Sequence, residues 1–134
     1  MVRSHKGQIS FAGGRRDDSD CDPAVTALRE LHEELGVPKE LVDIGGMLEP
    51  ISAMDGSAIY PVFGTADITP LQLQPSASEV AEVLTVPWPD VARASGRSFD
   101  FNLFGNWRTS WLFQTPSGGI WGLTALILHR AGLA

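Results

Sequence analysis

The chain has 134 residues, of which 43% are hydrophobic, and its formal net charge at pH 7 is −6. This length allows one moderate core, so we expect a single domain over residues 1–134. The negative balance argues against a nucleic-acid partner, and no stretch is long and apolar enough to suggest a membrane partner. The lone cysteine, Cys21, excludes an internal disulfide and fits a reducing compartment, so we expect a cytoplasmic protein.

The first element in chain order is a short strand that leads into a glycine turn. Residues 7–11 read Gly-Gln-Ile-Ser-Phe, and Ala12 then leads to Gly13 and Gly14. Alternating apolar and polar residues predict a strand. The two glycines allow another group to approach the backbone closely. A polar, aspartate-rich loop over residues 15–22 follows.

A helix is predicted over residues 23–35. Asp22 suits the N-cap position and Pro23 the first helical position. Gly36 suits the position just past the end of the helix.

Three carboxylates share one arc of this helix. At about 100° per residue, Glu30, Glu33 and Glu34 fall within an arc of roughly 100°. Like charges at this spacing repel one another, so we expect a counterion. A metal ion and nearby Lys or Arg side chains are both candidates. The adjacent arc is apolar and is expected to pack; it comprises Ala24, Ala27, Leu28, Leu31 and Leu35.

Several strands and two helices are predicted after the acidic helix. Strands over 43–54 and 57–67 are joined at Asp55-Gly56, which is a strong hairpin signal. A further strand is expected over residues 79–86, and a short helix over 87–95.

The last part of the chain is rich in aromatic residues. A strand is expected over residues 107–114, and a helix over 120–133 that covers the sheet. Aromatic side chains here are assigned mainly to the core, with one or two left as pocket lining. They are Phe99, Phe101, Phe104, Trp107, Trp111 and Phe113.

Residues 29–37 read Arg-Glu-Leu-His-Glu-Glu-Leu-Gly-Val and match the second half of the Nudix box at every specified position. The chain therefore resembles the Nudix hydrolases. The first half departs from the general pattern: the residue six after Gly14 is Asp20, and Arg29 comes one residue late. This longer aspartate-rich loop, together with the motif of residues 3–14, is similar to the coenzyme A pyrophosphatase branch of the family.

The resemblance implies an α/β fold, namely a Nudix-type α/β/α sandwich with a mixed central sheet. Met1 lies almost on the Arg-x-His motif at Arg3, so we expect the first strand of that sheet to be missing. A sheet edge left open in this way invites pairing with another chain. A homodimer is therefore left open.

The resemblance also implies a metal-dependent hydrolase that uses Mg²⁺ or Mn²⁺. Glu30, Glu33 and Arg29 form the implied catalytic set, in which Glu33 is a ligand or a water-orienting base. Arg29 would orient a glutamate of the same helix. The implied metal ligands are Glu30, Glu33, Glu34 and a backbone carbonyl of Gly14 or Gly13.

The implied substrate is a small nucleotide, coenzyme A or an acyl derivative, cleaved to adenosine 3′,5′-bisphosphate and a phosphopantetheine. A later carboxylate, Glu79 or Glu82, would complete the site or act as a base. Two alternatives stay open: a Nudix hydrolase acting on ADP-ribose or a nucleoside triphosphate, and a catalytically silent Nudix-like binding module. The expected substrate-binding residues are Arg3, His5, Gln8, Arg15 and Arg16.

Overall fold

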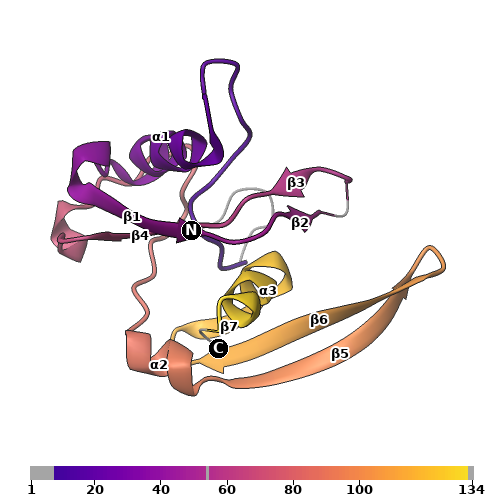
Figure 1. Ribbon diagram of the computed structural model, residues 1–134. Helices are drawn as coiled ribbons and strands as arrows, with labels where there is room; N and C mark the ends of the chain where they lie inside the picture. The colour runs from indigo at the N-terminus through magenta and orange to yellow at the C-terminus, as the bar shows by residue number, and fades with distance from the viewer. Residues whose placement is uncertain (1–7, 54, 133–134) are drawn as a thin grey trace. The chain divides into compact units, whose positions relative to one another are not determined.

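The computed structural model describes residues 8–53 and 55–132, which fall into two compact units (Figure 1). The acidic unit comprises residues 12–83, and the hairpin unit comprises residues 1–11 and 84–134. Four Arg or Lys stand against fourteen Asp or Glu in the acidic unit, a balance of −10. The hairpin unit has six against two, a balance of +4. Charge is therefore divided very unequally between the units.

Helix α1 of the acidic unit spans Pro23–Leu35, as the sequence predicts. The Asp22 side chain accepts a hydrogen bond of 2.9 Å from the Val25 N–H and caps the helix. Gly36 ends it with φ of 69°, and the Gly36 N–H donates to the His32 carbonyl. A Cβ on Gly36 would lie 2.8 Å from that of Gln74, so both backbone conformation and space require glycine.

The buried face of α1 differs from the expectation. Its most buried residues are Thr26, Glu30 and Glu34, which succeed one another at intervals of four; we call them the buried ridge. The apolar residues of the adjacent arc are half-buried, so they pack less completely than the ridge does. Polar groups of the preceding loop pair with the ridge, and this pairing makes burial of its carboxylates tolerable.

The predicted hairpin around Asp55 is confirmed, although its strands are interrupted. Strand β1 (Val42–Met47) pairs antiparallel with β4 (Val62–Ala66), and β2 (Ile51–Ser52) with β3 (Ala58–Ile59). The Ser57 N–H and hydroxyl both donate to the Asp55 carboxylate, at 2.9 and 2.6 Å, and lower its pKa. Two short 3₁₀ helices complete this unit, η1 (Lys39–Leu41) and η2 (Pro70–Gln72).

Two expected strands do not form. Residues 8–11 are not in a strand; Gly7 lies outside the described residues. The Ile9 carbonyl instead accepts a bond of 3.0 Å from the Thr124 hydroxyl, while its side chain packs on the core. Residues 79–86 begin with a turn, in which the Glu79 and Val80 N–H groups donate to the Ser76 carbonyl. Alternation alone was insufficient because a strand also needs a pairing partner.

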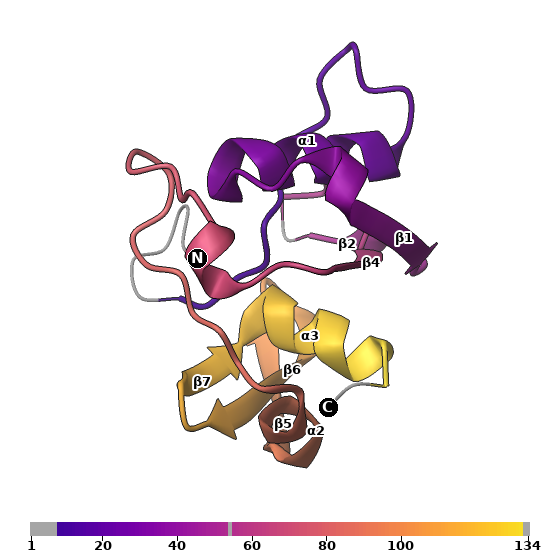
Figure 2. The same ribbon diagram turned by 90° about the vertical axis from the view of Figure 1, so that its left-hand side faces the viewer.

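The hairpin unit holds a three-stranded antiparallel sheet in the order β5-β6-β7. Helix α3 runs beside β6 and β7 (Figure 2). It begins two residues later than predicted because residues 118–121 form a strand, and β5 is a strand that was not predicted. The elements are α2 (Trp88–Arg93), β5 (Ser95–Leu103), β6 (Asn106–Thr115), β7 (Gly118–Trp121) and α3 (Gly122–Arg130).

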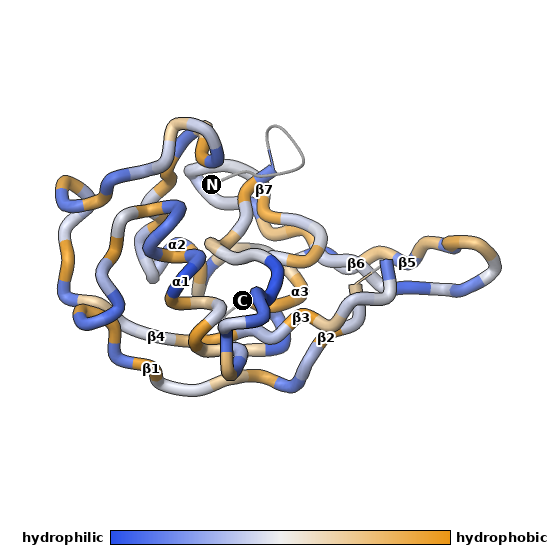
Figure 3. Tube along the Cα trace, turned by 90° about the horizontal axis from the view of Figure 1, so that it is seen from above, coloured by the Kyte–Doolittle hydropathy of each residue, from blue (hydrophilic) through white to orange (hydrophobic). Residues whose placement is uncertain are grey.

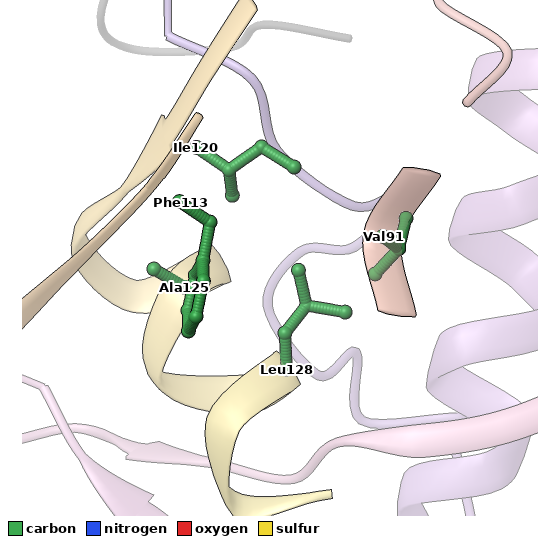
Figure 4. Packing of buried hydrophobic residues seen from close by; sticks show 5 residues of the cluster. All are labelled: Val91, Phe113, Ile120, Ala125 and Leu128. Carbon is green, nitrogen blue, oxygen red and sulfur yellow. The ribbon is translucent and has the colours of Figure 1, made fainter. Parts of the chain in front are cut away.

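A small apolar core holds the hairpin unit together. Side chains from α2, β6, β7 and α3 converge in it (Figure 4); they are Val91, Phe113, Ile120, Ala125 and Leu128. Trp111 stacks on His129 with ring centroids 3.8 Å apart. The expectation that the aromatic residues are mainly core holds for Phe113 but is wrong for Phe99, Phe104 and Trp107, which are exposed.

The α/β class is confirmed. All strand pairs of the described residues are antiparallel and lie in three small sheets, so a single mixed sheet is not formed by these pairs. The single domain over 1–134 stays a prediction, as does the missing first strand. No helix among the described residues has the length and hydropathy needed to cross a bilayer.

Candidate active site

Asp20 is the centre of a polar network at the start of the acidic unit. The residue is only 2% exposed, and its carboxylate accepts hydrogen bonds from the Asp17 N–H at 2.9 Å and the Thr26 hydroxyl at 3.0 Å. The Arg29 guanidinium donates to it through Nη2 at 2.9 Å and through Nε at 3.2 Å. These bonds, above all those from Arg29, hold the pKa of Asp20 well below its usual range.

Arg29 connects this network to the carboxylates of the box. Its Nη1 lies 3.2 Å from Oε1 of Glu30 and 3.2 Å from both carboxylate oxygens of Glu33. Its Nη2 also donates to the Arg15 carbonyl at 2.9 Å. The hydrogen bonds to Asp20 are the largest cause of an Arg29 pKa above its ordinary value. The guanidinium is therefore permanently charged and anchored by Asp20 while it faces two glutamates.

Glu34 is the most deeply buried carboxylate, with no exposed surface. Its Oε2 accepts a hydrogen bond of 3.2 Å from the N–H of Gly13, twenty-one residues earlier in the chain. The glycine turn thus lies directly against the buried ridge. This contact agrees with the close backbone approach that the sequence predicts at these glycines. A carbonyl of Gly14 or Gly13 as a metal ligand stays a prediction.

The carboxyl end of α1 is joined to the segment that carries the later glutamates. The Ser76 N–H donates to the Glu34 carbonyl and the Gln74 N–H to the Leu35 carbonyl, both at 2.8 Å. Glu79 follows in the next turn and is half-buried, whereas Glu82 is exposed. This connection favours Glu79 over Glu82 as a neighbour of the ridge.

The donor chemistry of this region suits a hard divalent cation. Glu30, Glu33 and Glu34 supply carboxylate oxygens from adjacent turns, which are the ligands that Mg²⁺ and Mn²⁺ prefer. Four carboxylates lie within 3.5 Å of the Arg29 guanidinium, those of Asp17, Asp20, Glu30 and Glu33, so negative charge is in excess even before Glu34 is counted. In the described part of the chain, however, no three His, Cys, Asp or Glu side chains converge as a ligand group. The residues fit the metal in kind and charge, while Glu30 and Glu33 face Arg29 in this arrangement.

The predicted substrate-binding residues have different outcomes. Arg15 and Arg16 are exposed, and both are tied to the network: the Arg15 carbonyl accepts from Arg29, and the Arg16 Nε donates to the Asp20 carbonyl at 3.0 Å. Gln8 belongs to the hairpin unit and lies beside Gly122. Arg3 and His5 lie outside the described residues. The substrate roles of all five residues stay predictions.

Asp20 and Thr26 were missed as site residues. Asp20 stands six residues after Gly14, and we interpreted it as a departure from the box. Its position, bonded to the arginine of the box, gives it a clear structural role despite that departure. Thr26 precedes Glu30 by one helical turn, so the spacing of four was a signal that could have placed it on the same ridge.

The sequence matches a family model and several known proteins. Residues 1–107 match the NUDIX domain family. The chain is 37% identical over 135 residues to the uncharacterized Nudix hydrolase NudL of Cronobacter sakazakii. This alignment covers 98% of this chain and 69% of that protein. It is 36% identical over 134 residues to NudL of an Enterobacter species and 35% over 136 residues to that of Klebsiella pneumoniae. These alignments cover 98% and 99% of this chain and 69% of each relative. The box helix, its anchored arginine and these matches together show that the chain belongs to the Nudix family.

Proposed function

We propose that this Nudix hydrolase cleaves the diphosphate linkage of coenzyme A or an acyl derivative, giving adenosine 3′,5′-bisphosphate and a phosphopantetheine. Hydrolysis of a diphosphate linkage is the coarser activity that family membership supports. The finer substrate assignment is supported by the Gly-Gln-Ile-Ser-Phe lead-in and the long aspartate loop, which are similar to the coenzyme A pyrophosphatase branch. An activity on ADP-ribose or a nucleoside triphosphate is the nearest alternative.

One observation carries the proposal. Two glutamates of α1 that lie one turn apart are buried, and Asp20 holds the arginine of the same helix in place. Glu30 is 5% exposed and Glu34 is fully buried. Burying charge is costly unless a partner or a metal stabilises it. A surface helix whose charges were merely solvated would not bury these two. Arg29 supplies one positive charge beside Glu30, and Glu34 accepts one hydrogen bond from the Gly13 N–H, so the negative charge that remains in excess favours a cation-binding role.

In this proposal the three glutamates of α1 have different roles. Glu30 and Glu34 would hold Mg²⁺ or Mn²⁺, which when bound would neutralise charge on the diphosphate and lower the pKa of a water molecule. Glu33, on the exposed side of the helix, would take the proton of the attacking water. Oxygen from water then bonds to one phosphorus as the bridging P–O bond breaks, and the second phosphate leaves.

Arg29 and Gly13 act as positioning groups. Arg29 donates hydrogen bonds to Asp20 through Nε and Nη2. Its Nη1 is then free to donate to Glu30 and Glu33. The Gly13 N–H holds one oxygen of Glu34 at 3.2 Å and so fixes the orientation of that carboxylate. The loop that carries Arg15 and Arg16 is anchored at the same network, so in this proposal their two cations would attract an anionic substrate toward the acidic helix.

The test is a substrate panel. We would incubate the protein with coenzyme A, ADP-ribose and dGTP in Mg²⁺ or Mn²⁺ and resolve the products by chromatography. We expect cleavage of coenzyme A and loss of turnover by about 100-fold or more in Glu34→Gln. Cleavage of ADP-ribose alone would overturn the coenzyme A assignment, and unchanged turnover in Glu34→Gln would overturn the site.

A silent binding module is the second candidate. It is favoured by one observation: Arg29 already faces Glu30 and Glu33, and no ligand group of three converges among the described residues. Calorimetric binding of coenzyme A without cleavage, in the presence of Mg²⁺ or Mn²⁺, would support this reading. Turnover of any member of the panel would exclude it.

A further inference from the structure

Strand β5 presents a long open edge. In the described part of the chain the sheet order is β5-β6-β7, so β5 has a strand neighbour on one side only. Its nine residues pair continuously with β6, from Ser95 opposite Gln114 to Leu103 opposite Asn106, with no shift of register. An extended strand of this length offers about 30 Å of backbone donors and acceptors on its free side.

Two other edge strands, β7 and β1, have features that oppose edge-to-edge pairing and that β5 lacks. β7, at the opposite edge of the same sheet, has four residues and runs directly into α3. β1 carries a register shift between Ile44 and Gly46. Short strands, bulges, prolines and lysines are the usual devices against edge-to-edge pairing, and β5 contains none of them.

The side chains of β5 are accessible and partly aromatic. Residues 96–100 are all exposed, and the Phe99 side chain is 51% exposed. Phe99 and Phe101 lie on one face with ring centroids 6.3 Å apart. Gly96 is opposite the core residue Phe113, so the core lies on the even-numbered face and the two phenylalanines lie on the other. Figure 3 shows hydrophobic stretches along the projecting part of this hairpin.

We propose that β5 is a self-association surface, on which the same strand of a second copy adds antiparallel, edge to edge. A two-fold antiparallel pairing joins residues that share a face, because side chains directly opposite point the same way. Pairing centred on Phe99 sets Phe99 against its own copy and Arg97 against Phe101. Aromatic pairs and an arginine over an aromatic ring are both favourable cross-strand contacts. This inference is independent of the proposed enzymatic function.

The charges of the edge favour a second copy as the occupant. The exposed segment carries one cation, Arg97, and one anion, Asp100, so two copies do not repel each other. In the centred pairing Asp100 stands opposite Ser98, whose hydroxyl can donate to it. An anionic lipid surface would instead require an excess of positive charge, which this edge lacks.

The test measures the oligomeric state of the full chain by sedimentation velocity over about 1–300 µM, a range that brackets a weak dimer. We expect a concentration-dependent dimer with a dissociation constant of about 10–100 µM, since one strand pair is a small interface. Phe99→Lys places a charge at the centre of the edge and should weaken the dimer at least about 10-fold. Arg97→Glu, which leaves two acidic residues on the edge, should weaken it as well.

Matched controls separate the edge from the hairpin tip. Phe104, in the β5–β6 turn, is 96% exposed but lies outside the strand, so Phe104→Ser should leave the dimer intact. Far-ultraviolet circular dichroism would establish that each variant is folded. A monomer at every concentration would overturn the proposal, as would a dimer that survives both edge variants. Binding of monomeric protein to phosphatidylserine vesicles that Phe104→Ser abolishes would reassign the hairpin to a lipid surface.

Discussion

The two units of this chain differ in the charged residues that they bury: the acidic unit buries three carboxylates beside a few apolar side chains, and the hairpin unit buries none among its described residues. The most deeply buried side chains of the acidic unit include Glu34, Asp20 and Glu30, whereas the hairpin unit buries Phe113, Ala125 and Leu128. Apolar burial stabilises a fold directly, whereas buried carboxylates contribute only when they are paired. The comparison teaches that the hairpin unit is organised by its core and the acidic unit by a polar network around Arg29.

The largest loss of stability is expected in the apolar core. Phe113→Ala removes a ring that is 2% exposed, so we expect the free energy of unfolding to fall by about 3–5 kcal/mol. Urea denaturation followed by fluorescence would measure it. Phe104→Ala, in the same hairpin but fully in solvent, is the matched control and should change little. Similar losses in both variants would contradict the assignment of the core.

A change in the polar network around Arg29 should lower turnover and alter how stability depends on pH. Asp20→Asn removes the negative charge that holds Arg29 in position, so we expect turnover to fall by about 10–100-fold. Asp18→Asn changes an exposed residue, and its turnover should stay near that of wild type. Because the pKa of Asp20 is lowered in the folded state, its stabilising effect is complete above the unfolded value of about 4 and is lost as the pH falls further.

Thermal unfolding of wild type and Asp20→Asn would check this pH dependence. The difference between their melting temperatures should be constant from about pH 5 to 8 and should shrink below about pH 4. A difference that grew on acidification would mean that Asp20 is not held as the anion by Arg29.

The end of α1 should be less sensitive. Gly36→Ala places a Cβ at positive φ and 2.8 Å from that of Gln74, so we expect a loss of about 1–2 kcal/mol in the free energy of unfolding. Gly46→Ala is the control, since nothing lies within 4 Å of its added Cβ. Equal effects on stability in chemical denaturation would show that the glycine cap is unimportant.

The smallest expected effect concerns the ridge. Thr26→Val keeps the shape of the side chain but removes the hydroxyl that donates to Asp20, which should cost about 1 kcal/mol. The exposed Thr65→Val serves as the control. An unchanged free energy of unfolding in Thr26→Val would indicate that the hydroxyl does not contribute to the network.

Local signals predicted the elements that local interactions fix. The bounds of α1 follow from Asp22, Pro23 and Gly36, whose caps act within a few residues. The hairpin at Asp55 likewise depends on its own turn. Strand β5 pairs with β6 across the two-residue turn Phe104-Gly105, a local signal that was missed. The strands expected at 7–11 and 79–86 have no pairing partner among the described residues, and alternation alone does not reveal whether a partner exists.

The candidate site was predicted in part. The spacing of Glu30, Glu33 and Glu34 identified the acidic helix, because a helical period places them on one arc. Burial of the ridge could not be predicted, since it depends on Gly13 and Asp20 folding back from an irregular loop. The anchoring of Arg29 by Asp20 was missed for the same reason: Arg29 lies nine positions after Asp20, and both loop and helix lie between them.

The central claim is that the buried ridge of α1 binds a divalent cation. Titration of the protein with Mn²⁺, followed by electron paramagnetic resonance of the free ion, tests it most directly. We expect binding by wild type, binding weakened by about 10-fold or more in Glu34→Gln, and unchanged binding in Glu40→Gln, an exposed glutamate of η1 that lies outside α1. Equal affinity of Glu34→Gln and wild type would contradict the account.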